Sequence, residues 1–437
     1  MIERVRRQLS GEIARGAIGT FGLKGFQTTI MFLVSLSLAR LLGPDGYGAY
    51  SFAMSWVNIL IVPAMLGLQP LLVRNLAAYQ TKGNWGLMRG LMRRTQQWTL
   101  LSGGAVLALA YLASWLLADT MEPAMLHAVW VALAIVPLVA QQRLRQSIMR
   151  ALHRVVSGQV PEMMIQPALF GAFLGCAFLF YSQSLTAPIA TGLRLTAACL
   201  ALIVILVLCH RTVPREVRHE RPSYRDGPWF RASLSMMWSN GMSVFIANIG
   251  TILVGILAGA ESAGIFSLVN LMANLISFAV ASINSPLAPA LSRHYVRDDM
   301  ATVQRLATKA ARAALLAALG MAAIFAATGD WALALIHPRF AAGYETLLIL
   351  CGGQVVLSSL GSVGVILVTA GEQRSLALTV TISAAITTSM CFLLIPLWGV
   401  EGAAVASIAG PLMMKLTNAV RAYNRLGVNT TVLRRLA

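Results

Sequence analysis

Long runs of apolar residues alternate with short polar stretches along the whole chain. Twelve of these runs are long enough to be helices that cross a membrane, because about 20 apolar residues span the roughly 30 Å of hydrocarbon. They occupy residues 17–42, 47–72, 96–118, 124–142, 160–181, 186–209, 232–258, 262–290, 310–328, 342–369, 375–397 and 401–423. The pattern therefore predicts an all-α integral membrane protein with about twelve transmembrane helices.

A tight polar turn separates the first two of these helices, in the stretch LARLLGPDGYGAYSFA at residues 38–53. Gly43 and Gly46 allow a sharp reversal of the backbone. Pro44 suits the first turn of a helix or the second position of a β-turn, and Asp45 can cap the helix that follows. We expect this short connection to hold the two antiparallel helices together as one unit.

A weaker copy of the same turn recurs 216 residues later in the chain. Without any gap, Gly43 aligns with Gly259 and Gly48 aligns with Gly264. The same register pairs Leu41 with Leu257, Ser51 with Ser267, Asn58 with Asn274, Pro70 with Pro286, and Arg89 with Arg305. The chain thus reads as two six-helix halves, and an even number of helices in each half makes the repeats parallel about an axis along the membrane normal.

This repeat predicts a division into two lobes around a central cavity. Residues 1–210 form the N-terminal six-helix lobe, residues 211–231 a basic cytoplasmic linker, and residues 232–437 the C-terminal six-helix lobe with a short basic tail.

The composition agrees with a membrane protein and explains the net charge. Of the 437 residues, 57% are apolar and 11% are charged, whereas soluble domains have about 25% charged residues. The formal charge of +18 comes from basic residues that gather in alternate loops, as in residues 74–94 and 211–231. Excess Lys and Arg stay on the cytoplasmic side, so both termini are expected to be cytoplasmic and no nucleic acid partner is expected.

Polar residues recur on one face of several predicted helices. The stripes on the second and eighth helices correspond in register, which favours a substrate cavity where the lobes meet. Asn and Ser side chains that only join neighbouring helices are the alternative. The residues expected to line the cavity are Lys24, Gln27, Thr28, Arg40, Asn58, Gln69, Arg194, Asn240, Asn270, Asn274 and Asn284.

Two roles stay open for the cationic members of this set. Lys24 lies about 10 Å into the first helix, where it either binds an anion or extends its stem to the interface. The same choice applies to Arg194 in the sixth helix, while Arg40 lies near a helix end, where an interfacial position is the alternative. Asn240 takes the place of Lys24 in the second half, so the charge of the expected site is asymmetric.

Motifs of catalytic classes are absent from the sequence. No phosphate-binding string G-x-x-x-x-G-K-[ST] occurs, the six histidines are scattered, and the five cysteines lie in apolar runs without metal-ligand spacing. The paired carboxylates Asp298 and Asp299 follow Arg297, as in a solvated loop. We therefore expect a transporter rather than an enzyme, with no catalytic residue, metal site or cofactor.

The turn also carries a family resemblance. ARLLGPDGYGAYSFA, followed by a second helix with Gly67 and Leu68 near its end and then a basic loop, resembles the first two helices of the bacterial polysaccharide biosynthesis flippases. These are lipid-linked oligosaccharide exporters, of the O-antigen type among others, in the superfamily of multidrug, oligosaccharidyl-lipid and polysaccharide exporters. The peptidoglycan-precursor branch matches less well, because its members usually have fourteen helices and several cavity arginines.

The resemblance implies a flippase of the bacterial cytoplasmic (inner) membrane. Its substrate would be an oligosaccharide on undecaprenyl pyrophosphate, moved to the outer leaflet by alternating access for O-antigen, capsule or exopolysaccharide synthesis. Membrane lipids, a polysaccharide polymerase and the chain-length machinery would be its partners.

Two alternatives remain from the sequence. The first is a cation-coupled small-molecule or multidrug exporter of the related branch, which would be expected to use an intramembrane carboxylate. A membrane scaffold without transport is the second, and it would leave the repeat and the polar stripes unexplained.

Overall fold

The computed structural model describes residues 2–181 and 185–432, and within these ranges the chain contains helices and connecting turns but no β-strand. Short 3₁₀ turns (η1, Ala118–Thr120; η3, Pro338–Gly343) and one π-helical turn (η2, Pro161–Ile165) join some of the α-helices. The α-helices are α1 (Ile2–Met65), α2 (Leu68–Thr81), α3 (Trp85–Leu116), α4 (Pro123–Leu133), α5 (Ile135–Ala151), α6 (Val155–Val160), α7 (Gln166–Tyr181), α8 (Ala187–Thr212), α9 (Arg215–His219), α10 (Asp226–Val296), α11 (Met300–Ile336), α12 (Tyr344–Ser359), α13 (Val363–Thr369) and α14 (Gln373–Leu426).

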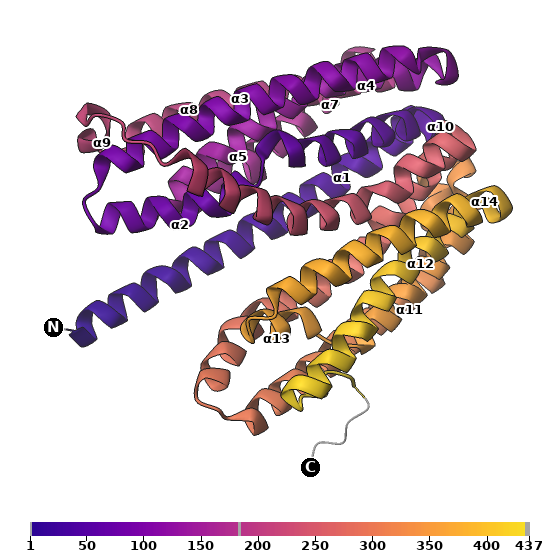
Figure 1. Cartoon of the computed structure of the whole chain (residues 1–437). Coiled ribbons are helices and arrows are strands. Elements are labelled where there is room, and N and C mark those ends of the chain that lie inside the picture. Colours follow the sequence, from indigo (N-terminus) through magenta and orange to yellow (C-terminus); the bar gives the residue numbers. More distant parts are fainter. Residues whose placement is uncertain (1, 182–184, 433–437) are drawn as a thin grey trace. The chain divides into compact units, whose positions relative to one another are not determined.

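The described chain holds nine helical stretches that are long and apolar enough to cross a membrane. Three of them contain one glycine with non-helical backbone angles, Gly43 in α1, Gly259 in α10 and Gly399 in α14. All three glycines have a positive φ, which a residue without Cβ adopts at little cost. Each divides its helix into two arms, and Figure 1 shows the two arms of α14 side by side. The predicted all-α fold with about twelve transmembrane helices is therefore confirmed.

Several helix ends differ from the sequence expectation. The second predicted helix is interrupted at Leu66 and Gly67, both with positive φ, before α2 begins. A Cβ on Gly67 would lie 2.3 Å from the carbonyl oxygen of Ser233, so the close approach of α10 requires glycine there. The fourth helix was expected to end at residue 142, but α5 continues to Ala151 and carries the polar residues after 142 on a helix rather than in a loop.

The chain divides into two compact units, and a short segment of the N-terminal half belongs to the second unit. The first unit comprises Met1–Leu42 and Trp56–Gly241, and the second comprises Gly43–Ser55 and Met242–Ala437. In the first unit, leucines of α2 and α3 pack with Leu144 and Ile148 of α5 in one buried cluster. A smaller cluster around Leu291 and Val303 lies in the second unit.

The turn segment Gly43–Ser55 is packed inside the second unit. A Cβ on Gly48 would lie 1.8 Å from the carbonyl oxygen of Ala260, and one on Gly264 would lie 2.1 Å from the carbonyl oxygen of Pro44. Real Cβ contacts are never this short, so glycine at both positions lets the two turn copies approach backbone to backbone.

Arg339 joins the two turn copies by charge. Its Nη1 lies 2.8 Å from Oδ2 of Asp45 and 3.3 Å from Oε1 of Glu261. Next to it, the rings of Tyr47 and Phe340 meet edge to face, with centroids 6.3 Å apart. One arginine therefore pairs with the acidic residues of both turn copies, a contact that the sequence pattern did not indicate.

Candidate functional site

The residues predicted to line a cavity divide between the two units, with eight in the first and Asn270, Asn274 and Asn284 in the second. On α1, Lys24 is exposed, and Gln27 and Thr28 are half-buried. The Thr28 hydroxyl donates to the carbonyl oxygen of Lys24 at 2.8 Å, so it is bound within its own helix.

Arg194 lies on α8, half-buried beside an aromatic ring. Its guanidinium carbon is 5.9 Å from the centroid of the Phe170 ring of α7, within the range of a cation–π contact. Arg40, Asn58 and Asn240 are exposed, and Gln69 is half-buried. Because a cationic side chain on an apolar helix is costly, Lys24 and Arg194 are the members of the predicted set that we would expect to bind an anion.

In the second unit, the predicted asparagines bond partly to one another and partly to neighbouring helices. Asn274 Nδ2 donates to Asn270 Oδ1 at 3.4 Å along α10. The Ser362 hydroxyl, just before α13, donates to Asn284 Oδ1. The bond at Asn284 joins two segments of the unit, as expected for a polar residue that holds helices together.

An ion pair that the sequence did not suggest lies inside the first unit. Arg143 Nε of α5 is 3.0 Å from Oε1 of Glu162, which lies in the π-helical turn η2. The sequence interpretation placed Arg143 in a loop and Glu162 near a helix end, so the two were not considered together. The fold places Arg143 on a helix and turns Glu162 toward it at the π turn, a feature that occurs often at functional sites.

Sequence reasoning also missed Lys415, a lysine within an apolar helix. It lies in the last apolar run, half-buried on α14, and its Nζ donates to the carbonyl oxygen of Leu357 at 2.7 Å. Among the described residues no carboxylate forms an ion pair with it. The signal was available, since a lysine within an apolar helix is by default a candidate functional residue.

Asp299, one of the paired acids of the sequence, caps the start of a helix. Asp299 precedes α11 and accepts from the backbone N–H of Thr302 at 3.0 Å, while His294 Nδ1 lies 3.2 Å from its other oxygen. The pKa of Asp299 is lowered, most by the hydrogen bond from the Thr302 side chain, then by that from the Thr302 backbone N–H, and less by His294. Among the described residues, no group of three or more His, Cys, Asp or Glu side chains could hold a metal ion.

Comparisons with known proteins agree with this architecture. The polysaccharide biosynthesis protein family matches the sequence over residues 13–294, more than half of the chain. A search of curated proteins finds no match.

Two solved membrane transporters share the fold at 12% sequence identity. One is described as the inward-facing conformation of a multidrug resistance MATE family transporter of the MOP superfamily, with a TM-score of 0.75 over 94% of this chain and 98% of that one. The other is the lipid II flippase MurJ in an inward closed conformation, with a TM-score of 0.72 over 94% of this chain and 87% of that one. The resemblance drawn from the turn motif is thereby confirmed at the level of family and fold.

Proposed function

We propose, on the premise that this chain belongs to the polysaccharide biosynthesis protein family, that it moves a lipid-linked oligosaccharide across the bacterial cytoplasmic membrane. The substrate class is an oligosaccharide on a polyprenyl pyrophosphate of the undecaprenyl type, destined for O-antigen, capsule or exopolysaccharide. The observation that carries the proposal is the family match over residues 13–294 together with a fold shared with a lipid II flippase. The polysaccharide polymerase and chain-length machinery would take up the product.

The intramembrane cations fit a substrate with a pyrophosphate group. Lys24 is exposed on α1, and the half-buried guanidinium of Arg194 on α8 lies 5.9 Å from the centroid of the Phe170 ring. A pyrophosphate that leaves water needs such charge-assisted hydrogen bonds, because its desolvation is otherwise costly. We assign the head group to these cations and leave the lipid tail in the bilayer.

Alternating access would expose this site first to one side of the membrane and then to the other. Outward movement of negative charge is favoured by a potential that is negative inside, by about 2.3 kcal/mol per charge per 100 mV. The membrane potential could thus drive the step without nucleotide hydrolysis.

Loss of the gene is expected to leave lipid-linked repeat units on the cytoplasmic side and to remove the surface polysaccharide. Extraction measures the amount of lipid-linked oligosaccharide in the membrane. Inside-out and right-side-out vesicles then show on which side of the membrane it lies. Resistance to cationic drugs should stay at the parental level. Normal surface polysaccharide with reduced drug resistance would refute the proposal in favour of drug export.

Drug export is the second candidate, because the fold likeness to a multidrug resistance MATE transporter favours it. An exporter coupled to a cation would need an acidic residue in the membrane, and Glu162 is the acid in the described helices that fits this need. Its partner Arg143, at 3.0 Å, already supplies the positive charge that a coupling cation would bring. We therefore place drug export second.

The proposed orientation places both termini in the cytoplasm, and cysteine labelling tests it. In a background with the five native cysteines replaced, Glu122→Cys and Glu401→Cys should react with an impermeant maleimide added to intact cells. Thr81→Cys and Asn429→Cys should react only after the membrane is permeabilised. Labelling of the second pair in intact cells would reverse the orientation.

A further inference from the structure

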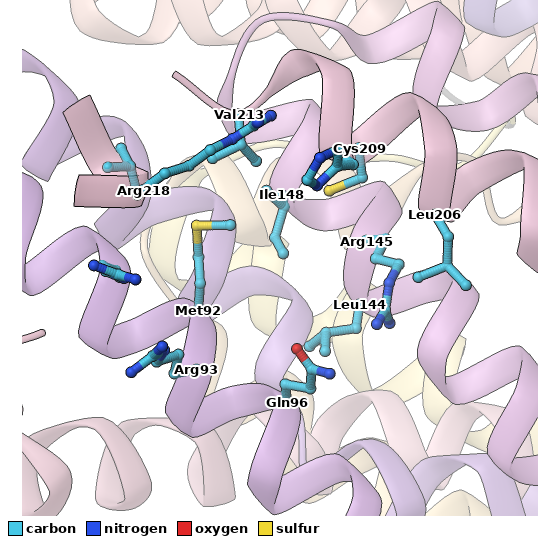
Figure 2. Close-up of a pocket in the computed structure, with 13 residues that line it drawn as sticks. Met92, Arg93, Gln96, Leu144, Arg145, Ile148, Leu206, Cys209, Val213 and Arg218 are labelled. Carbon is cyan, nitrogen blue, oxygen red and sulfur yellow. The ribbon is translucent and has the colours of Figure 1, made fainter. Parts of the chain in front are cut away.

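A basic pocket in the first unit lies outside the predicted substrate site. It encloses about 320 Å³ between α3, α5, α8 and the short helix α9. Four arginines and one histidine line it, and no Asp or Glu side chain is among the lining residues. Figure 2 shows the side chains of Arg93, Arg145 and Arg218 on different sides of this pocket.

In the part of the chain that the structure describes, the four arginines of the pocket form no ion pair with an acidic side chain. Arg145 donates to the carbonyl oxygen of Gln141 at 3.1 Å and to the side-chain oxygen of the same residue, and Arg89 donates to the backbone oxygen of Glu220. Arg93 and Arg218 form neither a hydrogen bond nor an ion pair with any described residue. All three of these acceptors are neutral oxygens, so among the described residues no carboxylate pairs with the positive charge of the pocket. Glu216 and Glu220, on the linker side, are exposed and do not line the pocket.

The walls of the pocket are formed by well-packed segments of the first unit. Leu144, Ile148 and Val217 of its lining are buried members of the main apolar cluster of this unit. The linker that carries α9 is fixed to α3, because Ser223 N donates to the Gly86 carbonyl at 2.9 Å and Arg94 Nε donates to Asp226 Oδ1 at 2.8 Å. A cation-rich mouth over a fixed apolar floor is a site for an anion that carries an apolar part.

An exposed apolar strip on α8 continues from this mouth. Leu206, which lines the pocket, is 38% exposed, and Ile203 and Val207 beside it are 55% and 46% exposed. In a membrane these side chains face acyl chains, so a lipid whose phosphate enters the pocket can lay a chain along α8. A free phosphate ion would gain nothing from this strip.

We propose that this pocket binds the phosphate of an anionic glycerophospholipid, with Arg93 and Arg218 as its principal ligands and Arg145 at its inner wall. The lipid thereby connects α3 to the linker helix α9. This site is separate from the transported substrate, which we assign to Lys24 and Arg194, and the inference does not depend on what the protein transports.

Native mass spectrometry of the full chain in detergent tests the proposal with phosphatidylglycerol as the probe. The parent protein should retain one tightly bound phosphatidylglycerol, and phosphatidylcholine of the same chain length should bind far more weakly. The double variant Arg93→Gln with Arg218→Gln should bind phosphatidylglycerol at least about tenfold more weakly, since each basic residue near a lipid surface contributes substantially to attraction.

The matched control is the double variant Arg74→Gln with Arg154→Gln, which removes the same charge from exposed positions outside the pocket. It should bind phosphatidylglycerol within about twofold of the parent. Equal losses in the two double variants would overturn the proposal, because attraction would then be diffuse. Displacement of the lipid by inorganic phosphate at equal concentration would overturn it too, since the site would then take any phosphate. Melting temperatures near the parental value show that both variants are folded, and an unfolded pocket variant is replaced in the same assay by Arg93→Gln alone.

Discussion

Replacing Lys24 with alanine is expected to abolish export of the surface polysaccharide while the protein stays at its normal level in the membrane. The side chain is exposed on α1, and the residue at the matching position of the second half, Asn240, is neutral. The proposed anion site therefore depends on few charges, and loss of one leaves the pyrophosphate poorly compensated. The amount of surface polysaccharide measures export, and immunoblotting of the membrane fraction measures the level of the protein.

Four further variants separate the effect of charge from the effect of position. Lys24→Arg should retain much of the export, and Asn240→Asp should weaken it by repelling the anion. Arg194→Ala is expected to resemble Lys24→Ala, whereas Lys82→Ala, in a loop after α2, should export normally. Normal export by Lys24→Ala would mean that this lysine only reaches the interface, and the substrate charge would then have to be met by Arg194 or Arg40.

Replacing Gly48 with leucine is expected to reduce export at least about tenfold, because overpacking a close contact costs about 1–3 kcal/mol. A Cβ at this position would lie 1.8 Å from the Ala260 carbonyl oxygen and 2.8 Å from the Gly264 nitrogen. Both neighbours are backbone atoms that cannot rotate away, so the turn segment Gly43–Ser55 would be displaced from the second unit. Export assays at equal protein levels measure the loss.

The matched control is Gly104→Leu on α3, where a new Cβ meets no atom within 4 Å. This variant should export like the parent. Gly48→Ala should fall between the two, since its smaller side chain requires a smaller shift. If Gly48→Leu exported at the parental rate, the close approach of the two turn copies would have no part in the transport cycle.

The sequence by itself determined the helical membrane fold and the position of its sharpest turns. Apolar runs of membrane length leave a chain no other structure in lipid, because each backbone polar group must be bonded within its own helix. Gly43 and Gly259 were recognisable from their repeat offset, and both have a positive φ, whereas Gly46, also expected to contribute to the reversal, does not. These features depend on residues near one another in the chain.

Contacts between distant residues were decided only by the tertiary structure. Arg143 pairs with Glu162 because α5 runs on past the predicted helix end and a π turn rotates the acid toward it. Arg339 pairs with Asp45, 294 positions away in the sequence. Gly48 lies close to Ala260 in the second unit, although most of the N-terminal half of the chain belongs to the first unit. Hydropathy and local spacing describe which face of a helix is polar, but they do not describe which other helix that face will meet. The pairing of charges and the basic pocket therefore follow from packing, which is a property of the whole folded chain.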